Sequence, residues 1–238
     1  YFASSLLSTA MGALRNPPEH HYFRYDFRVT FEDLGTYHAS NISTSSWELS
    51  SDLTNPLEAV MANPFAKPPK LLRIDATVTI VPEVIDARIV QAKLDKSTVK
   101  PGELVRGHLL IEQYRKPRRK LPFSIRIPKT MPDGTYPLTV GGLQVALYAL
   151  RDEQPQTFTP RTIKAIFALT QAIATPRNDR LYLHLPLPAS AGLTLGDKPL
   201  DSLPSSKAGP ILQADLPETQ HTSKSILTSQ PIDVILGY

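Results

Sequence analysis

The sequence predicts a mainly β fold, with an Ig-like β-sandwich over residues 71–142 and flanking α+β segments that contain helices. Short runs of alternating apolar and polar residues recur at intervals of roughly 10 to 15 residues, as in sandwich folds. Turn residues, Pro101-Gly102 and Asp133-Gly134 among them, separate these runs. The chain has 23 prolines and only 11 glycines, and so many prolines disfavour long helices.

The segment before the sandwich, residues 1–70, reads as helix, strand and helix, and we expect it to be the end of an upstream domain. Apolar residues between Phe2 and Leu14 recur at helical spacing, and a signal-peptide core is the alternative interpretation. Tyr22 to Phe31 alternates strictly, which predicts a strand with one buried face. Leu49 to Met61 then predicts a second helix, with a restart at Asn55-Pro56.

Within 71–142 we expect strands at about 72–80, 85–94, 104–113, 120–127 and 135–140. The alternation predicts which side chains form the core of this sandwich. They are Ile74, Val78, Ile89, Leu109, Ile125, Tyr136 and Leu138.

Residues 143–238 predict a small α+β segment. Thr159 and Pro160 have the residue types of a helix N-cap and first turn, and Pro176 ends the helix. Leu181 to Leu185 and Ile232 to Leu236 alternate as strands do.

Composition excludes several classes of protein. The chain has no cysteine, so disulfides, thiol catalysis and thiolate metal sites are excluded. It has no apolar run of the length, about 18 residues, that predicts a membrane-spanning helix. The net charge of +4 is too mild to indicate nucleic-acid binding.

A set of motifs in a fixed order resembles a known family. Asn63-Pro64-Phe65 is followed by Val99-Lys100-Pro101-Gly102-Glu103, and then by Pro132-Asp133-Gly134-Thr135-Tyr136. Downstream come Asn178-Asp179-Arg180-Leu181-Tyr182-Leu183 and Leu203-Pro204-Ser205-Ser206. Together they resemble the C-terminal, non-catalytic region of bacterial proteins with a SpoIVB-type serine peptidase domain, of the planctomycete and acidobacterial type. The resemblance covers about residues 63–238.

The resemblance implies a structural or interaction module of a larger bacterial envelope, periplasmic or secreted protein. Its implied partner is an upstream peptidase-type domain, or another envelope protein. No segment matches the glycine-rich serine motif of that peptidase domain, so no catalytic residue is carried over. The alternative is a serine peptidase-related hydrolase to which this chain contributes part of the site.

A basic run is the best candidate for a binding site. Tyr114 to Lys120 holds five cations in seven residues, beside a tyrosine that offers a stacking surface. Such a loop can bind phosphate, sulfated glycan or an acidic partner, and the alternative role is to keep a hairpin soluble and its edge unpaired. The candidate binding residues are Tyr114, Arg115, Lys116, Arg118, Arg119 and Lys120.

Three further groups suggest chemistry less specifically. Ser205 and Ser206 before Lys207 could form a nucleophile and base, or a solvated loop. His20 and His21 with His38 could hold a metal ion, although adjacent histidines on an extended chain point to opposite faces. The aromatic stripe of Phe23, Tyr25 and Phe27 could form a sugar platform, but its alternation with Val29 and Phe31 favours core. We therefore predict no catalytic residue, no metal and no cofactor.

Overall fold

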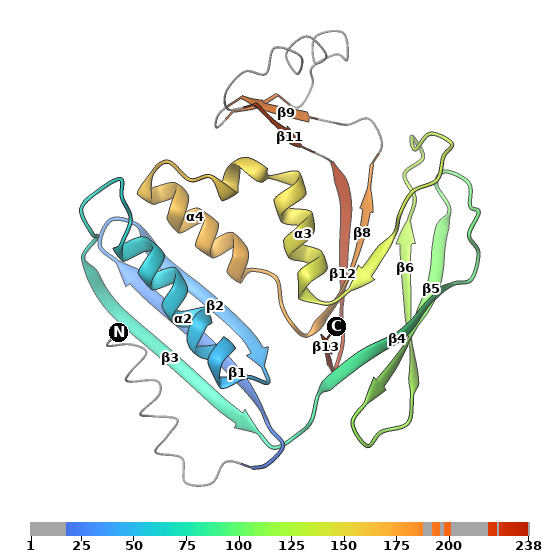
Figure 1. The fold of residues 1–238 in the computed structure, drawn as a ribbon, viewed down its shortest axis with the longest axis horizontal. Coiled ribbons are helices and arrows are strands. Elements are labelled where there is room, and N and C mark those ends of the chain that lie inside the picture. Colours follow the sequence, from blue (N-terminus) through green and yellow to red (C-terminus); the bar gives the residue numbers. More distant parts are fainter. Residues whose placement is uncertain (1–17, 188–191, 196–197, 201–218, 223, 238) are drawn as a thin grey trace.

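The chain folds as a mainly β protein with helical segments, which confirms the predicted fold class (Figure 1). The structure is a computed structural model that describes residues 18–187, 192–195, 198–200, 219–222 and 224–237. The helix predicted between Phe2 and Leu14 lies outside these residues.

The first layered unit is a three-stranded antiparallel sheet with the order β2-β1-β3. The central strand is β1 (Tyr22–Phe31), and β2 (Gly35–Ser43) and β3 (Leu71–Val81) are its neighbours. Helices α2 (Ser46–Met61) and α4 (Ile163–Ala174) pack on one face of this sheet. The predicted strand over 22–31 and the predicted second helix are therefore confirmed.

Strict alternation along β1 explains why this sheet has one apolar face. The odd-numbered side chains from Phe23 to Phe31 are at most 3% exposed and form the core with α2. The helix starts where the Ser45 hydroxyl accepts a hydrogen bond from the Glu48 N–H. Pro56 lies inside the helix, which continues through the expected restart point.

The second unit is a sandwich of two sheets. The first sheet has the order β13-β4-β5-β6, with β13 Ile235–Gly237, β4 Asp86–Leu94, β5 Leu104–Gln113 and β6 Arg119–Arg126. The second sheet has the order β12-β8-β7, with β12 Ser225–Pro231, β8 Arg180–Pro186 and β7 Thr139–Gly141. All neighbours are antiparallel except β13, which runs parallel to β4.

One apolar core lies between the two sheets of the sandwich. Leu109 and Ile111 of β5 and Leu181 of β8 are fully buried in it. Gly107 permits the close approach of the strands, because a Cβ there would lie 2.5 Å from the Lys93 carbonyl oxygen. The Pro101-Gly102 turn forms as expected, with Gly102 at a φ of +87°.

The strand pairing differs from the expected sandwich at 71–142 in three respects. β3 pairs with β1, so Ile74 and Val78 pack in the first core and not in the sandwich core. The other five predicted core residues, from Ile89 to Leu138, do pack in the sandwich. The sandwich also takes three strands from beyond residue 142, because its second sheet is built on β8 and β12. β7 is shorter than the strand expected at 135–140.

The helices between the two units begin at different residues from those expected. α4 begins at Ile163 with Thr162 as its N-cap, whose hydroxyl accepts from the Ala165 N–H, and Thr159 instead ends a short 3-10 turn, η1 (Pro155–Phe158). The run after Gly142 forms α3 (Leu143–Glu153), which packs on the outer face of β8. A small sheet contains β9 Gly192–Leu195, β10 Lys198–Leu200 and β11 Thr219–Thr222.

The sandwich core should dominate the stability of the second unit. Leu109→Ala removes a fully buried side chain and should lower the free energy of unfolding by about 2–5 kcal/mol in urea titrations. Leu227→Ala, at a side chain that is 39% exposed, is the matched control and should cost markedly less. Equal losses in the two variants would contradict this assignment of the core.

Candidate functional site

The basic loop forms the hairpin connection between β5 and β6. Every residue from Tyr114 to Arg118 is exposed, as is Lys120. Arg115 has a left-handed backbone, with φ of 56°, and its guanidinium lies 4.9 Å from the centre of the Tyr114 ring. The loop therefore has the exposed position that its charge predicts, since unpaired cations are costly to bury.

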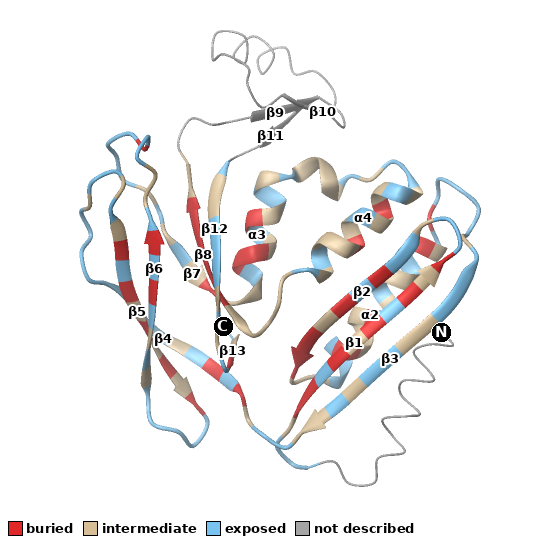
Figure 2. Ribbon diagram, turned by 180° about the vertical axis from the view of Figure 1, so that it is seen from behind, coloured by how far each residue is buried: buried red, intermediate tan, exposed pale blue. Residues whose placement is uncertain are grey.

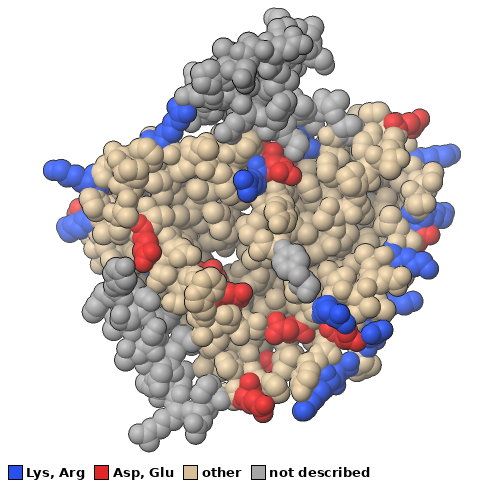
Figure 3. Space-filling view, in the orientation of Figure 1, with Lys and Arg blue, Asp and Glu red and all other residues tan. Residues whose placement is uncertain are grey.

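Carboxylates neutralise much of this loop. Arg118 bonds to Glu112 at 2.9 Å, and Lys116 lies 3.7 Å from Glu83. Arg119 forms an ion pair with Asp233 from the loop before β13. Lys and Arg gather on the side of the molecule formed by β4, β5 and β6, with Asp and Glu among them (Figure 3).

The pKa values of these carboxylates reflect the pairing. Hydrogen bonds from Arg88 and then Arg118 lower the pKa of Glu112, and the Arg119 hydrogen bond lowers that of Asp233. Arg115 and Lys120 have no carboxylate partner among the described residues. These two cations, with the Tyr114 ring, are the part of the loop that remains available to an anion.

The histidines are not brought together. The His20 ring contacts Tyr114 and the His21 ring contacts Phe23. His38 instead pairs with Asp26 at 2.7 Å on the solvent face of the first sheet. Within the described ranges, no cluster of three or more histidine or acidic side chains could hold a metal ion.

The other two candidate sites have different outcomes. Ser205, Ser206 and Lys207 lie outside the described residues. The aromatic stripe is core: Tyr25 stacks on Phe27 with ring centres 4.7 Å apart, beneath the helices. It offers no platform for a sugar.

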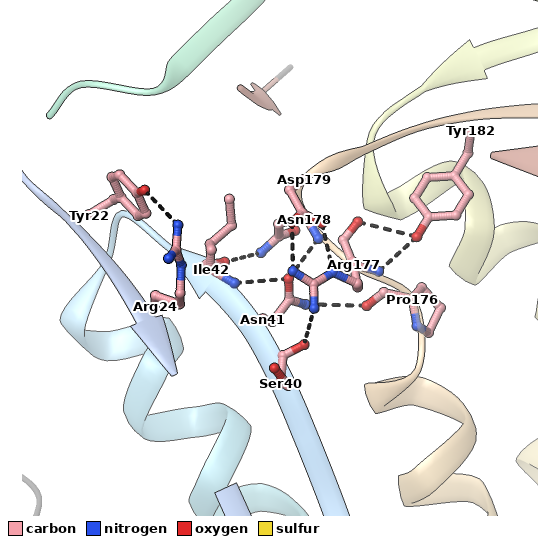
Figure 4. Close-up of polar contacts among 10 residues, drawn as sticks. All are labelled: Tyr22, Arg24, Ser40, Asn41, Ile42, Pro176, Arg177, Asn178, Asp179 and Tyr182. Carbon is pink, nitrogen blue, oxygen red and sulfur yellow. Dashed lines mark hydrogen bonds and ion pairs between the residues drawn. The ribbon is translucent and has the colours of Figure 1, made fainter. Parts of the chain in front are cut away.

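A polar junction, which sequence reasoning missed, joins β2 to the loop before β8 (Figure 4). The Asn41 amide donates to the Pro176 carbonyl at 3.2 Å, and its oxygen accepts from the Asn178 N–H at 2.8 Å. Arg177 binds both carboxylate oxygens of Asp179 at 2.8 and 2.6 Å. The Tyr182 hydroxyl accepts from the Arg177 N–H at 2.7 Å. A polar residue at 41 in an alternating strand was the only available signal.

This junction also seals the outer edge of β2. The Asn178 amide donates to the Ile42 carbonyl, and Arg177 donates to the Ser40 carbonyl. Further along, the Gln171 side chain of α4 accepts from the His38 N–H at 3.0 Å and donates to the His38 carbonyl at 2.8 Å. Side chains thus take the place of a neighbouring strand along this edge.

The opposite edge of the same sheet, on β3, is open. The backbone N–H and C=O groups of His38 in β2 point away from β1. In this antiparallel register, the backbone groups of the even-numbered residues of β1 therefore bond to β3. The backbone groups of the even-numbered residues of β3 then point away from β1, toward the outer edge of the sheet. The outward residues are Ile74, Ala76, Val78 and Ile80. No described residue bonds to their backbone N–H or C=O groups. Figure 2 shows many buried residues along β1 and β2, whereas every residue of β3 is intermediate or exposed.

A partly buried carboxylate on α2, that of Asp52, is a second feature that sequence reasoning missed. The Asp52 carboxylate accepts a hydrogen bond from the Tyr25 hydroxyl, and the Asp52 backbone carbonyl accepts one from the Tyr37 hydroxyl at 3.2 Å. Burial raises the pKa of Asp52, although the Tyr25 hydrogen bond acts in the opposite direction. Burial, and then the Asp52 charge, raise the pKa of Tyr25. The signal was an acidic residue next to Leu53 on the buried stripe of the helix.

No family model, no curated protein and no solved structure matches the chain. Among the described residues, no helix is both long enough and apolar enough to cross a membrane.

Asp52 should make stability depend on pH in a characteristic direction. Its folded-state pKa is raised, so its contribution is complete below the unfolded pKa and is lost as pH rises through the folded pKa. Relative to Asp52→Asn, the wild-type chain should therefore lose stability as the pH rises above the unfolded pKa of about 4, as measured by urea unfolding.

Asp26→Asn is the matched control for this measurement. The His38 hydrogen bond lowers the pKa of Asp26, so its contribution exists above the unfolded pKa and is lost as pH falls. The stability difference between wild type and Asp26→Asn should thus be constant above about pH 4 and shrink only below it, whereas the difference between wild type and Asp52→Asn should change above about pH 4. The same pH dependence of stability in both variants would show that burial does not raise the pKa of Asp52.

Proposed function

We propose that this chain is a non-catalytic structural or interaction module of a larger protein. The open edge of β3 is the observation that supports the proposal. From Ile74 to Ile80 the strand exposes its outward backbone groups, and Leu72, beside a register shift at the start of the strand, is 52% exposed. An unpaired edge of this length is a template for pairing with another chain.

The contrast between the two edges of one sheet strengthens this support. On β2, the outward backbone groups of His38, Ser40 and Ile42 each bond to a side chain from α4 or from the loop before β8. β3 contains no proline and no lysine, and its charged residues and register shift lie near its start, so the stretch from Ala76 to Val81 carries none of the usual protection against pairing. It also lies at the periphery, on the side of its sheet away from the sandwich (Figure 1).

The setting of this module rests on the family resemblance. The motifs from Asn63 to Ser206 resemble the region that accompanies a SpoIVB-type peptidase domain in bacterial envelope or secreted proteins. Under this proposal, the module packs against or presents such a domain, or another envelope protein. Its own role is contact and not turnover.

A second candidate function is anion binding at the basic loop. Arg115 and Lys120 are exposed and lack carboxylate partners among the described residues, and Tyr114 is 53% exposed beside them. A phosphate or sulfated glycan would find two cations and an aromatic face there. The ion pairs of Lys116, Arg118 and Arg119 limit this function to part of the loop.

The proposed function predicts contact at β3 without hydrolysis. In the protein as its gene encodes it, a photo-crosslinking amino acid at Ala76 should form a defined product, mapped by mass spectrometry. The same group at His38, on the sealed edge, should form none. The isolated chain should show neither labelling by a fluorophosphonate probe nor cleavage of casein. Labelling of a serine of this chain together with turnover would overturn the non-catalytic assignment, and absence of crosslinks at Ala76 would remove the interaction role.

The anion-binding candidate has its own test on a heparin column. Arg115→Gln with Lys120→Gln removes the unpaired cations and should elute at clearly lower salt than wild type. Lys116→Gln with Arg118→Gln removes the same net charge from paired positions and should shift elution less. Equal shifts would assign the retention to net charge alone and would eliminate the loop as a site.

A further inference from the structure

The edge of β3 is self-complementary. The strand is 11 residues long, Leu71–Val81, so Ala76 lies at its centre. If a second copy pairs antiparallel with Ala76 opposite Ala76, the whole strand overlaps. Leu72 then faces Ile80 and Ile74 faces Val78. Every apolar residue of the even-numbered row meets another apolar residue.

The backbone allows this register. Two antiparallel strands exchange paired hydrogen bonds where residues with outward N–H and C=O groups lie opposite each other. From Ile74 to Ile80 these are the even-numbered residues of β3, and this register places Ile74, Ala76 and Val78 opposite other even-numbered residues of the same stretch. A shift by one residue would place apolar side chains opposite polar ones, which the pattern disfavours.

The solvent face is also compatible. Asp75 would lie opposite Thr77 of the second copy, and Arg73 opposite Thr79, so no like charges face each other directly. Asp75 is already neutralised within its own strand by Arg73 at 2.7 Å. No carboxylate would therefore have to be stripped of its partner when the strands pair.

The inner face gives such pairing an apolar contribution. Ile74, Val78 and Ile80 are only partly buried against the first core, and Ala76 between them is exposed. The helices cover β1 and β2 more completely than β3 (Figure 2). A second copy would extend this apolar row across the dyad and remove it from water.

We propose that the chain forms a symmetric dimer through β3, with Ala76 on the two-fold axis. The combined sheet has six strands in the order β2-β1-β3, followed by the same strands of the second copy in reverse. Its two outer edges are both β2, which side chains seal. Assembly therefore stops at two copies, and the contact is isologous and closed. The inference rests on the proposed interaction function and names its partner.

Cysteine crosslinking tests the register, because the chain has no cysteine of its own. In the proposed register, the two Cα atoms at position 76 lie about 5.5 Å apart, within the range of a disulfide. At position 77 they lie roughly 8 Å apart, from the strand spacing and the rise per residue, which is too far. Oxidation should link Ala76→Cys into a dimer and leave Thr77→Cys unlinked. Equal linking of both variants, or of neither, would overturn the register.

Charge exchange at the same position tests the interface while controlling for misfolding. Ala76→Lys and Ala76→Glu should each sediment as monomers in analytical ultracentrifugation, because like charges would meet on the axis. A mixture of the two should restore the dimer, which unfolded variants could not do. Thr77→Lys, on the polar face, should remain dimeric like the wild type.

The outcomes separate this inference from the proposed function. A wild-type chain that is monomeric up to high concentration overturns the dimer. If the photo-crosslinker at Ala76 then reacts with another domain or protein, the interaction function stands and only the choice of partner fails. If it reacts with residues 71–81 of a second copy, both hold.

Discussion

The edge of β2 is the constraint on which the arrangement of the molecule depends. Backbone N–H and C=O groups at a sheet edge need partners, and here they come from the chain segment that follows α4. Gln171 binds the middle of the strand, and Arg177 and Asn178 bind its end. Since β8 begins two residues after Asn178, the same bonds fix where the central strand of the second sandwich sheet starts.

The hydrogen bonds between β2 and the loop before β8 connect the first sheet, with its own apolar core, to the sandwich, which has a separate core. A small cluster of Tyr22, Ile42 and Ile85 lies where the first sheet meets the sandwich, beside the polar junction. The junction is mostly hydrogen-bonded to backbone, so its geometry is specified by direction as well as by burial. We therefore regard the two units as held in one relative orientation by a combination of apolar and directional contacts.

The sequence indicated most of the single elements, because alternation and turn residues are local signals. β1, α2, β4, β5, β6 and β8 all follow from such patterns. β2 was not foreseen, since Tyr37, Ala39 and Asn41 make a weak and partly polar stripe. The partner of β3 was not foreseen either, because pairing with β1 is set by contacts across about fifty residues that no local pattern encodes. For this reason the predicted start of the sandwich at residue 71 was wrong: the strand that begins there pairs with β1 and belongs to the first sheet.

At the candidate site too, local features could be predicted from the sequence and features that depend on distant contacts could not. The position and exposure of the basic loop followed from its charges and from the flanking strands. Its neutralisation did not, because Asp233 lies more than a hundred residues from Arg119 in sequence. Thr162 replaced Thr159 as the helix cap, since both have suitable side chains and only the packed structure decides between them.

The distribution of polar partners explains why an edge, and not a side-chain cluster, is the feature that supports a function here. Arg177 and Asn178 bond to backbone or to a neighbouring carboxylate, and Asp52 of α2 accepts a hydrogen bond from Tyr25 of β1. These groups stabilise the fold and are not free for a ligand. The outward N–H and C=O groups of β3 have no such partner among the described residues, and they lie on a regular strand with an apolar row beside them. In an aqueous protein such groups are satisfied by water until a matching strand replaces it, and burial of the apolar row then favours the exchange.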